Sequence, residues 1–339
     1  TATRLYPNYA NVDWSGNAGY DPKDLTTYFS TMGCRTANGW DVNGLGQQKD
    51  GRGNICPVTI ILPTLAKEVE NKVNKYLSNR ATNEEYMKEF LIALDKKIHE
   101  AKDMLLERFS FIASQSPASA RFMYDNNTMA GYVPEEGIIS ALKHGTLSLG
   151  QLGVAEALQI LIGCDHTTEE GMKYAKKIEQ LFADRCAEFK KEYQLNFGVY
   201  YTPAENLCHT ALKKFKAAYG VIPNVSDKDF FTNSIHVPVW KEMSAFDKID
   251  IESQLTGYSS AGCITYVELD GDVVGNMRDV PCLVNDAGGE QDGVPKLLHS
   301  GGGTDTGEHL LADAHGNLGI ELGVLNVHHG HTYALSGRD

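Results

Sequence analysis

The sequence predicts an α/β protein with a largely parallel sheet or barrel, and three observations support this fold class. Segments typical of strands alternate with segments typical of helices along most of the chain. The run 55–62 is apolar and β-branched on both faces, as in a buried strand. Residues 84–112 carry apolar side chains on one helical stripe, which is typical of core packing. With 339 residues and 42% hydrophobic content, the chain can form one large domain or two smaller ones.

The first elements follow from signals at their ends. Asp21-Pro22 offers an N-cap followed by proline at the first helical position, so we expect a short helix over 21–32 that Gly33 ends. After the strand at 55–62, Pro63 begins a second helix, which is expected to reach residue 77.

The later elements continue the alternation. We expect strands over 145–151, 197–201 and 263–269, helices over 153–162 and 203–219, and an extended piece over 230–239. Asp270-Gly271 predicts a turn after the last strand. This order favours a parallel arrangement, because each strand is followed by a helix that can return the chain.

Charge and cysteine content exclude several classes of protein. The net charge of -13 leaves no basic face for a nucleic-acid polymer or an anionic membrane. No apolar run is long enough to span a bilayer and no signal segment is evident, so a cytoplasmic location is expected. The seven cysteines are odd in number and widely spread, without metal-ligand spacing, so neither a disulfide framework nor a structural zinc is predicted.

The end of the sequence differs from the rest. Residues 279–339 hold 12 of the 33 glycines and six of the 11 histidines, with weak periodicity. We therefore divide the chain into a catalytic portion over 1–276 and a glycine- and histidine-rich tail of uncertain origin over 277–339. The histidines at 328–331 reflect this composition, and no metal site is predicted from them.

A lone thiol in a glycine-flanked loop is the clearest sign of chemistry. Cys34 follows Gly33, and a loop rich in Gly, Asn and Asp leads to Gly51-Arg52-Gly53-Asn54 at the start of a strand. Glycines at both ends let the backbone turn sharply and approach a ligand. This arrangement suits chemistry more than packing.

Two further motifs permit a functional and a structural interpretation. In 201–205, Thr202 fits an N-cap and Glu205 fits the capping box, either as an ordinary helix start or as a phosphate site. In 144–150, Thr146 and Ser148 share one strand face, either as part of a polar site or in packing. The run 231–238 interleaves polar side chains, and its His236 is more typical of a hydrogen-bonded structural histidine than of a ligand.

Together these segments resemble the anaerobic, class III ribonucleotide reductases over roughly residues 5 to 276. The resemblance rests on six motifs in order: 32–35, 51–54, 144–150, 201–205, 231–238 and 261–268. It implies part of a ten-stranded α/β barrel of the glycyl-radical enzyme type, with a central finger loop near 33–53. It also implies reduction of ribonucleoside triphosphates to deoxyribonucleotides by thiyl-radical chemistry.

The resemblance assigns roles to particular residues. Cys34 matches the cysteine that becomes a thiyl radical and removes the ribose 3′ hydrogen. Asn54 and Ser148 are candidates for polar contacts around the ribose, and Thr202, Ala204 and Glu205 begin a helix that faces the substrate phosphates. The implied partners are ribonucleoside triphosphates, formate or a thiol reductant, a radical-SAM activating enzyme, and a second copy or complementing subunit.

The sequence also departs from the family pattern. These residues do not contain the family's four-cysteine zinc module or its Arg-x-x-Gly-Tyr glycyl loop after Gly275, and they do not contain the earlier half of the family's barrel. We therefore expect no cofactor to be bound by these residues alone. The interpretation that follows is a fragment or split subunit whose residues from about 277 onward derive from a shifted reading frame.

Two alternative functions stay open at this stage. The first is a non-catalytic, nucleotide-binding or assembly subunit derived from the same barrel. The second is a thiol-dependent transferase or hydrolase, which ranks last because no histidine is paired with Cys34 by spacing.

Overall fold

A parallel three-stranded sheet in the order β1-β2-β3 forms the centre of the protein. The strands are β1 (Asn54–Ile61), β2 (Thr146–Leu152) and β3 (Asn196–Val199). We use a computed structural model, which describes residues 23, 38–46, 48, 50–77, 81–267 and 319–322. The predicted α/β class with a parallel sheet is confirmed.

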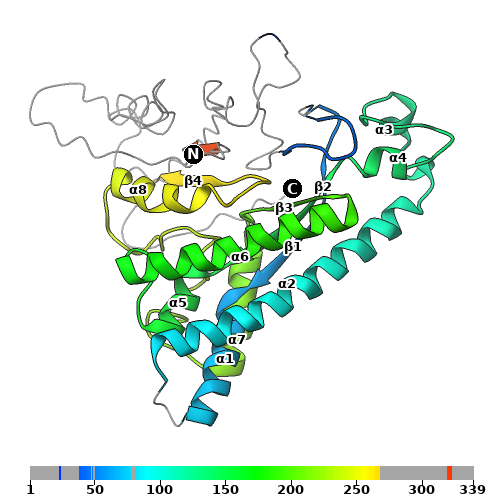
Figure 1. Ribbon diagram of the computed structural model, residues 1–339. Helices are drawn as coiled ribbons and strands as arrows, with labels where there is room; N and C mark the ends of the chain where they lie inside the picture. Colours follow the sequence, from blue (N-terminus) through cyan, green and yellow to red (C-terminus); the bar gives the residue numbers. More distant parts are fainter. Residues whose placement is uncertain are drawn as a thin grey trace, which may run out of the picture.

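Helices connect the strands and cover one face of the sheet. The helices are α1 (Leu62–Leu77), α2 (Asn83–Ala113), α3 (Arg121–Asp125), α4 (Ile139–Leu142), α5 (Val154–Ile162), α6 (Glu169–Tyr193), α7 (Asn206–Tyr219) and α8 (Ala245–Thr256), with a 3-10 helix at Pro117–Ala120. Figure 1 shows the long helices α2 and α6 running in front of the sheet, where α2 packs on β1 and α6 packs on β3.

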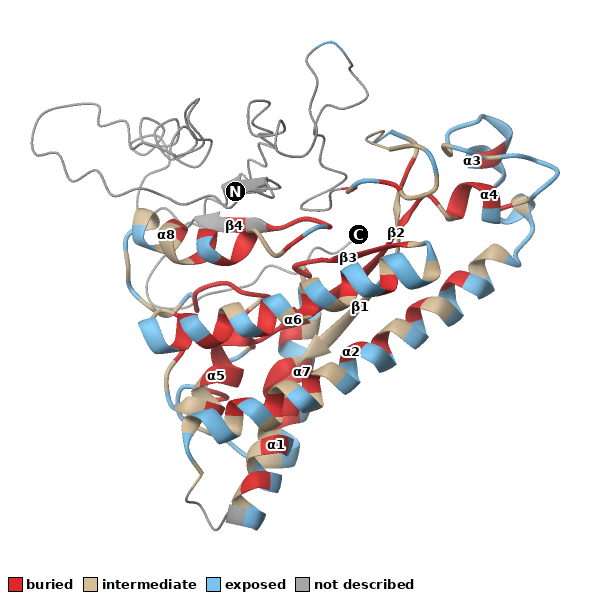
Figure 2. Cartoon of the chain, in the orientation of Figure 1, coloured by how far each residue is buried: buried red, intermediate tan, exposed pale blue. Residues whose placement is uncertain are grey.

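The two faces of the sheet differ in chemistry. Because paired residues of parallel strands point to the same side, Val58, Leu149 and Val199 share the face toward α2 and α6. Leu149 and Val199 are fully buried there, within a core that also includes Phe90 and Phe182 of those helices. Figure 2 shows β3 in the colour of buried residues. Each such side chain contributes roughly 2 kcal/mol of burial free energy.

A buried carboxyl group interrupts the apolar face. Gln151 on β2 donates from Nε2 to both carboxyl oxygens of Glu179 on α6, at 2.7 Å each. The Tyr201 hydroxyl donates to the carbonyl oxygen of Leu255 at the end of α8. Burial raises the pKa of Glu179 to about 8, and its hydrogen bonds with Gln151 oppose that rise.

Most of the predicted elements within the described residues are confirmed. The strands predicted at 55–62, 145–151 and 197–201 are β1, β2 and β3, and the helices predicted at 63–77, 84–112 and 153–162 are α1, α2 and α5. The strand predicted at 263–269 is β4 (Ile264–Val267). The helix predicted over 21–32 and the turn at Asp270-Gly271 lie outside the described residues.

Two predictions need correction, and two helices were missed. β1 was predicted to be buried on both faces, but it is an edge strand of the described sheet, and its described side chains are half-buried or exposed. The piece predicted as extended over 230–239 is interrupted by a turn at Ser234-Ile235, and it pairs with none of the described strands. The helices α6 and α8 were not predicted, although Thr168 and Ser244 cap them through their hydroxyl groups.

The chain continues beside β3 beyond α8. Ala261 donates its N–H to Val199 O at 2.8 Å, and Tyr201 donates to Gly262 O at 3.1 Å. The next strand, β4, pairs in parallel with β5 (Gly319–Leu322), which lies within the segment predicted as a tail. Of the helices that the structure describes, none has the length and apolar character needed to cross a membrane.

Candidate active site

The face of the sheet opposite α2 and α6 carries polar side chains and glycines. Ser148 on β2 is fully buried, and its hydroxyl donates to Oδ1 of Asn54 on β1 at 2.9 Å. Gly198 of β3 lies beside Ser148, so this face has no bulky side chain at the centre. The structure therefore brings together the two residues predicted from sequence as ribose contacts.

A second hydroxyl pair lies further along the same face. Thr59 of β1 donates to the hydroxyl of Thr202, which follows β3, at 2.9 Å. Gly150 lies between them on β2, and a Cβ at this position would come within 1.9 Å of Thr202 Oγ1. Only glycine therefore leaves room for the Thr202 side chain.

The turn from Thr202 to α7 has an unusual backbone. Ala204 and Glu205 have φ values of 57° and 40°, in the left-handed region that residues other than glycine rarely occupy. Such conformations cost roughly 1–3 kcal/mol each and persist only where the surroundings enforce them. Backbone strain at this point marks the turn as a candidate for function.

The predicted capping of this helix is wrong. α7 begins at Asn206 with Glu205 as its N-cap, and no side chain makes a capping hydrogen bond. The Thr202 hydroxyl instead bonds with Thr59 and with the carbonyl oxygen of Tyr200, because Thr202 still belongs to the extension of β3. The N-terminus of α7 therefore begins three residues later than predicted and has no side-chain cap.

A neighbouring segment holds the strained turn in place. Ser234 donates from its hydroxyl to Thr202 O at 2.7 Å, and the Asn233 amide donates to Pro203 O. Ser234 itself has a φ of 40°. Two strained stretches thus support each other through these two hydrogen bonds.

Two buried carboxyl groups hold the segment 231–238, which contains Ser234, in place. Glu156 on α5 accepts from the N–H of Thr232 at 2.7 Å and from its hydroxyl at 2.6 Å. Burial raises the pKa of Glu156 to about 7, and the bonds with Thr232 oppose that rise. His236 contacts Oε2 of Glu252 through Nδ1 at 3.0 Å, in the structural role predicted for it.

Some of these residues were missed in the sequence, and one predicted residue lies outside the described structure. Thr59 lay in a run that was interpreted only as a buried strand, and Glu156 has the position of an ordinary first-turn acid. Neither has a local signal, since their partners are distant in the chain. Cys34 lies outside the described residues.

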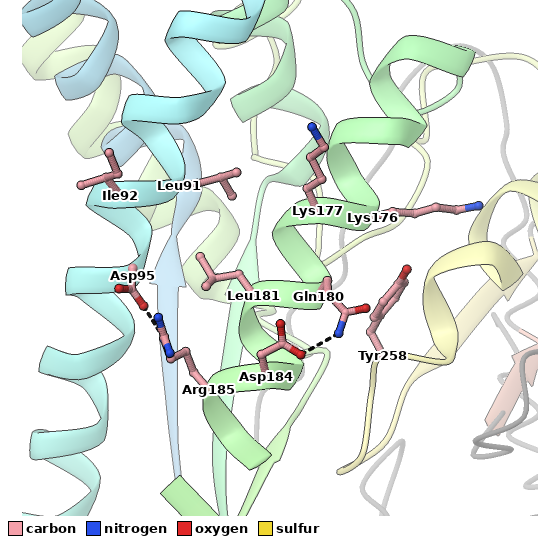
Figure 3. Close-up of a pocket in the computed structure, with 10 residues that line it drawn as sticks. All are labelled: Leu91, Ile92, Asp95, Lys176, Lys177, Gln180, Leu181, Asp184, Arg185 and Tyr258. Carbon is pink, nitrogen blue, oxygen red and sulfur yellow. Dashed lines mark hydrogen bonds and ion pairs between the residues drawn. The ribbon is translucent and has the colours of Figure 1, made fainter. Parts of the chain in front are cut away.

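The outer surface of the helices contains a cavity of a different kind. A groove of about 610 Å³ lies between α2 and α6, with Leu91 and Leu181 among its lining residues (Figure 3). Its arginine, Arg185, is paired with Asp95 at 2.6 Å. No residue predicted as a site lines this groove. Within the described ranges, no group of three or more His, Cys, Asp or Glu side chains is placed to hold a metal ion.

The chain is similar to known proteins over most of its length. The family model described as anaerobic ribonucleoside-triphosphate reductase matches residues 1–288. The enzyme of that name from Escherichia coli (strain K12) is 30% identical over 272 residues, covering 78% of this chain and 35% of the relative. The one from Enterobacteria phage T4 is 29% identical over 253 residues, covering 74% of this chain and 38% of the relative.

Solved structures share the fold at lower identity. The anaerobic ribonucleotide reductase from Thermotoga maritima with glycerol in the active site has a TM-score of 0.52 and 16% identity, covering 82% of this chain and 37% of the other. A second anaerobic ribonucleotide reductase has a TM-score of 0.55 and 15% identity, covering 81% and 35%. The present chain therefore spans little more than a third of the length of these proteins.

Proposed function

The chain belongs to the anaerobic ribonucleoside-triphosphate reductase family, and we propose that it carries the radical cysteine and one substrate-binding wall of such an enzyme. The family match confirms the resemblance seen in the sequence. The observation that carries the proposal is the polar sheet face, where Asn54 bonds with Ser148 and Thr59 bonds with Thr202. The reaction is the reduction of ribonucleoside triphosphates to deoxyribonucleotides.

The N-terminus of α7 is the proposed phosphate site. A helix N-terminus presents backbone N–H groups and the positive end of the helix dipole, both of which favour a phosphate. No side chain caps α7, and the exposed Glu205 is its N-cap residue. Thr202, Ala204 and Glu205 would then shape the backbone around the triphosphate, held by Ser234 and Asn233.

Asn54 and Ser148 are the proposed ribose contacts. Ser148 donates to Asn54 Oδ1, which leaves the Asn54 amide N–H groups as donors for a sugar hydroxyl. The pair lies on the same face as Thr202, so one substrate can extend along this face from its sugar to its phosphates. Along the chain, too, the proposed ribose contacts come before the residues of the proposed phosphate site.

Cys34 is the proposed radical residue. The family's glycyl radical, which we propose lies outside these 339 residues, would supply the chemistry that takes the hydrogen atom from the Cys34 thiol. The Cys34 sulfur then takes the hydrogen atom from ribose C3′, and the C2′–O bond breaks as the oxygen takes up a proton and leaves as water.

The reduction is then completed. Oxidation of formate to carbon dioxide, or of a thiol pair to a disulfide, supplies two electrons and a proton at C2′. Cys34 returns its hydrogen atom to C3′, which restores the thiyl state.

The remaining partners follow from the family. We propose that the described sheet is part of the ten-stranded barrel, with the finger loop in its centre. The edge strand β1 leaves one side of the sheet unpaired within the described residues, which favours further strands from a longer polypeptide, a complementing chain or a second copy. A radical-SAM enzyme is the proposed activator.

An anaerobic assay tests the proposal. The protein, within the longer polypeptide or together with the complementing chain that carries the glycyl radical, is incubated with a radical-SAM activating enzyme, formate and ribonucleoside triphosphate, and deoxynucleotide is measured by chromatography. We expect product with the parent protein and none with Cys34→Ala. Nucleotide binding by calorimetry without turnover would instead support the non-catalytic subunit, and neither binding nor turnover would contradict both functions.

A further inference from the structure

A buried polar cluster joins the second half of the Cys34 loop to the starts of β2 and β3. Asp41, which is 1% exposed, contacts Nδ1 of His144 through Oδ2 at 2.8 Å. Its other oxygen accepts from Asn196 Nδ2 at 2.6 Å. His144 lies two residues before β2, and Asn196 is the first residue of β3. One loop carboxylate thus holds two adjacent strands at their N-terminal ends.

The same residues also bind the loop backbone. Val42 donates its N–H to Asn196 Oδ1 at 3.0 Å, and Leu45 donates to Asp41 Oδ2 at 2.9 Å. These bonds fix a tight turn that a backbone bridge between Asp41 and Gly46 closes. The turn therefore cannot move without breaking bonds inside the cluster.

Arg52 connects the cluster to both ends of the described loop. Its Nε donates to His144 O at 2.7 Å, and Nη1 donates to Gly39 O at 2.9 Å and to Gln48 O at 2.8 Å. Lys190 on α6 adds a bond to Trp40 O at 2.6 Å. Burial lowers the pKa of Arg52, and Asp41 opposes that change.

The His144 ring is held on its other side by the backbone. A Cβ at Gly131 would lie 2.3 Å from His144 Nε2, so the ring packs directly on this glycine. Nδ1 is thereby directed at Asp41 and the ring cannot turn away. The ring and the carboxylate are thus confined to one arrangement between the loop and the two strands. This geometry points to a role in positioning.

The cluster and the proposed ribose site share one strand. Thr146 donates to Asn38 Oδ1 at 3.3 Å, and Ser148, two residues further along β2, bonds with Asn54. Cys34 precedes Asn38 by four residues, a length that spans at most about 14 Å. Asn38 in the Cys34 loop and the proposed sugar contact Asn54 are therefore both bonded to the same strand, β2.

We propose that Asp41 and His144 are positioning residues that fix the Cys34 loop relative to Asn54 and Ser148. The proposal rests on the proposed function. It assigns these residues an effect on hydrogen abstraction, which depends on the distance from sulfur to C3′, and no direct contact with substrate. Their loss should lower kcat and leave KM for the nucleotide unchanged.

The test uses the whole chain and two variants. His144→Gln removes the ring, and Asp41→Asn keeps the shape of the side chain while removing its charge, so it retains the fold if the first variant does not. Glu179→Gln is the matched control, because Glu179 is also fully buried and bonds with Gln151 of β2, on the face of the sheet opposite the proposed site. Cys34 alkylation by N-ethylmaleimide is followed by peptide mass spectrometry, and exchange of the Val42 and Leu45 amides by deuterium uptake.

We expect alkylation of Cys34 and exchange of both amides to accelerate at least fivefold in the loop variants and to stay at the parent rate in the control. In the reconstituted reductase, kcat should fall at least tenfold with KM within twofold. Unchanged alkylation and exchange in folded variants would overturn the proposal, as would a rise in KM with kcat preserved. The labelling does not depend on turnover, so an inactive parent protein would contradict the proposed function without affecting this test.

Discussion

The hydroxyl of Thr59 lies 2.9 Å from the hydroxyl of Thr202, although 143 residues separate them in the chain. Thr59 is on the edge strand β1, and Thr202 follows β3 on the far side of β2. The bond passes over Gly150, whose missing side chain makes the approach possible. It ties the two outer strands together at the start of the proposed phosphate-binding turn.

A double-mutant cycle should detect this bond. We expect Thr59→Val and Thr202→Val to destabilise the protein singly, with a coupling free energy of about 1 kcal/mol between them, since they share one hydrogen bond. Urea unfolding of the parent, both single variants and the double variant measures the coupling. Thr59→Val combined with the distant Ser226→Ala should be additive. Additivity of the two threonine changes would show that the bond contributes nothing.

Gly150→Ala should displace Thr202. The added Cβ would meet Thr202 Oγ1 at 1.9 Å and the carbonyl oxygen of Tyr200 at 2.5 Å, and the second atom belongs to the backbone. We expect a loss of about 1–3 kcal/mol in unfolding free energy and weaker nucleotide binding. Gly53→Ala is the stability control, because a Cβ there meets no atom within 4 Å. Equal unfolding midpoints for the two variants would contradict the close approach.

Ser234→Ala should weaken substrate binding more than its loss of stability explains. The change removes the bond to Thr202 O and frees the strained turn before α7. We expect a loss of about 1 kcal/mol in stability and a severalfold increase in the nucleotide dissociation constant. Ser226→Ala removes a fully buried hydroxyl that bonds to the Gly220 carbonyl, outside the proposed site. A similar loss of binding in both variants would argue against a specific role for Ser234.

Stability should fall as pH rises through the ionisation range of Glu179. Its pKa is raised from 4.5 to about 8 in the folded protein. The stability that the neutral carboxyl provides is therefore full below pH 4.5 and is lost progressively up to pH 8, by a few kcal/mol. Glu179→Gln should match the parent at acidic pH and exceed it above pH 8. Urea unfolding from pH 5 to 9 measures this difference.

The exposed Glu192 on the same helix provides the control. Glu192→Gln should follow the pH profile of the parent protein. If Glu179→Gln also follows that profile, the buried carboxyl does not titrate as described.

The sequence predicted the repeating elements well because their signals are local. The stripe on α2, from Met87 to Phe109, is buried as its helical spacing indicates. The helix cap predicted at Thr202 was wrong for the opposite reason. Thr202-Pro203 and Glu205 satisfy a local capping pattern, but the Thr202 hydroxyl bonds with Thr59, which is distant in the chain. A hydrogen bond between distant segments leaves no mark in a short window of sequence.

The candidate site was predictable only in part for the same reason. Asn54 and Ser148 were predicted because they lie in sequence motifs, and a hydrogen bond joins them in the structure. Glu156 and Ser234 act through the segment they hold, and this depends on how α5 and the 231–237 segment meet. The half-buried state of β1 depends on which strands lie beside it, and no residue of β1 itself encodes that.

The passage from β1 to α1 has a mechanical consequence. β1 ends at Ile61 and α1 begins at Leu62, with no connecting residue between them. A slip of one residue in strand register would therefore rotate the helix by roughly 100° about its axis. The stripe from Leu62 through Ala66 to Val73, now buried, would then face solvent. The register of β1 therefore determines which side of α1 faces the core. This junction should tolerate substitution far better than insertion or deletion.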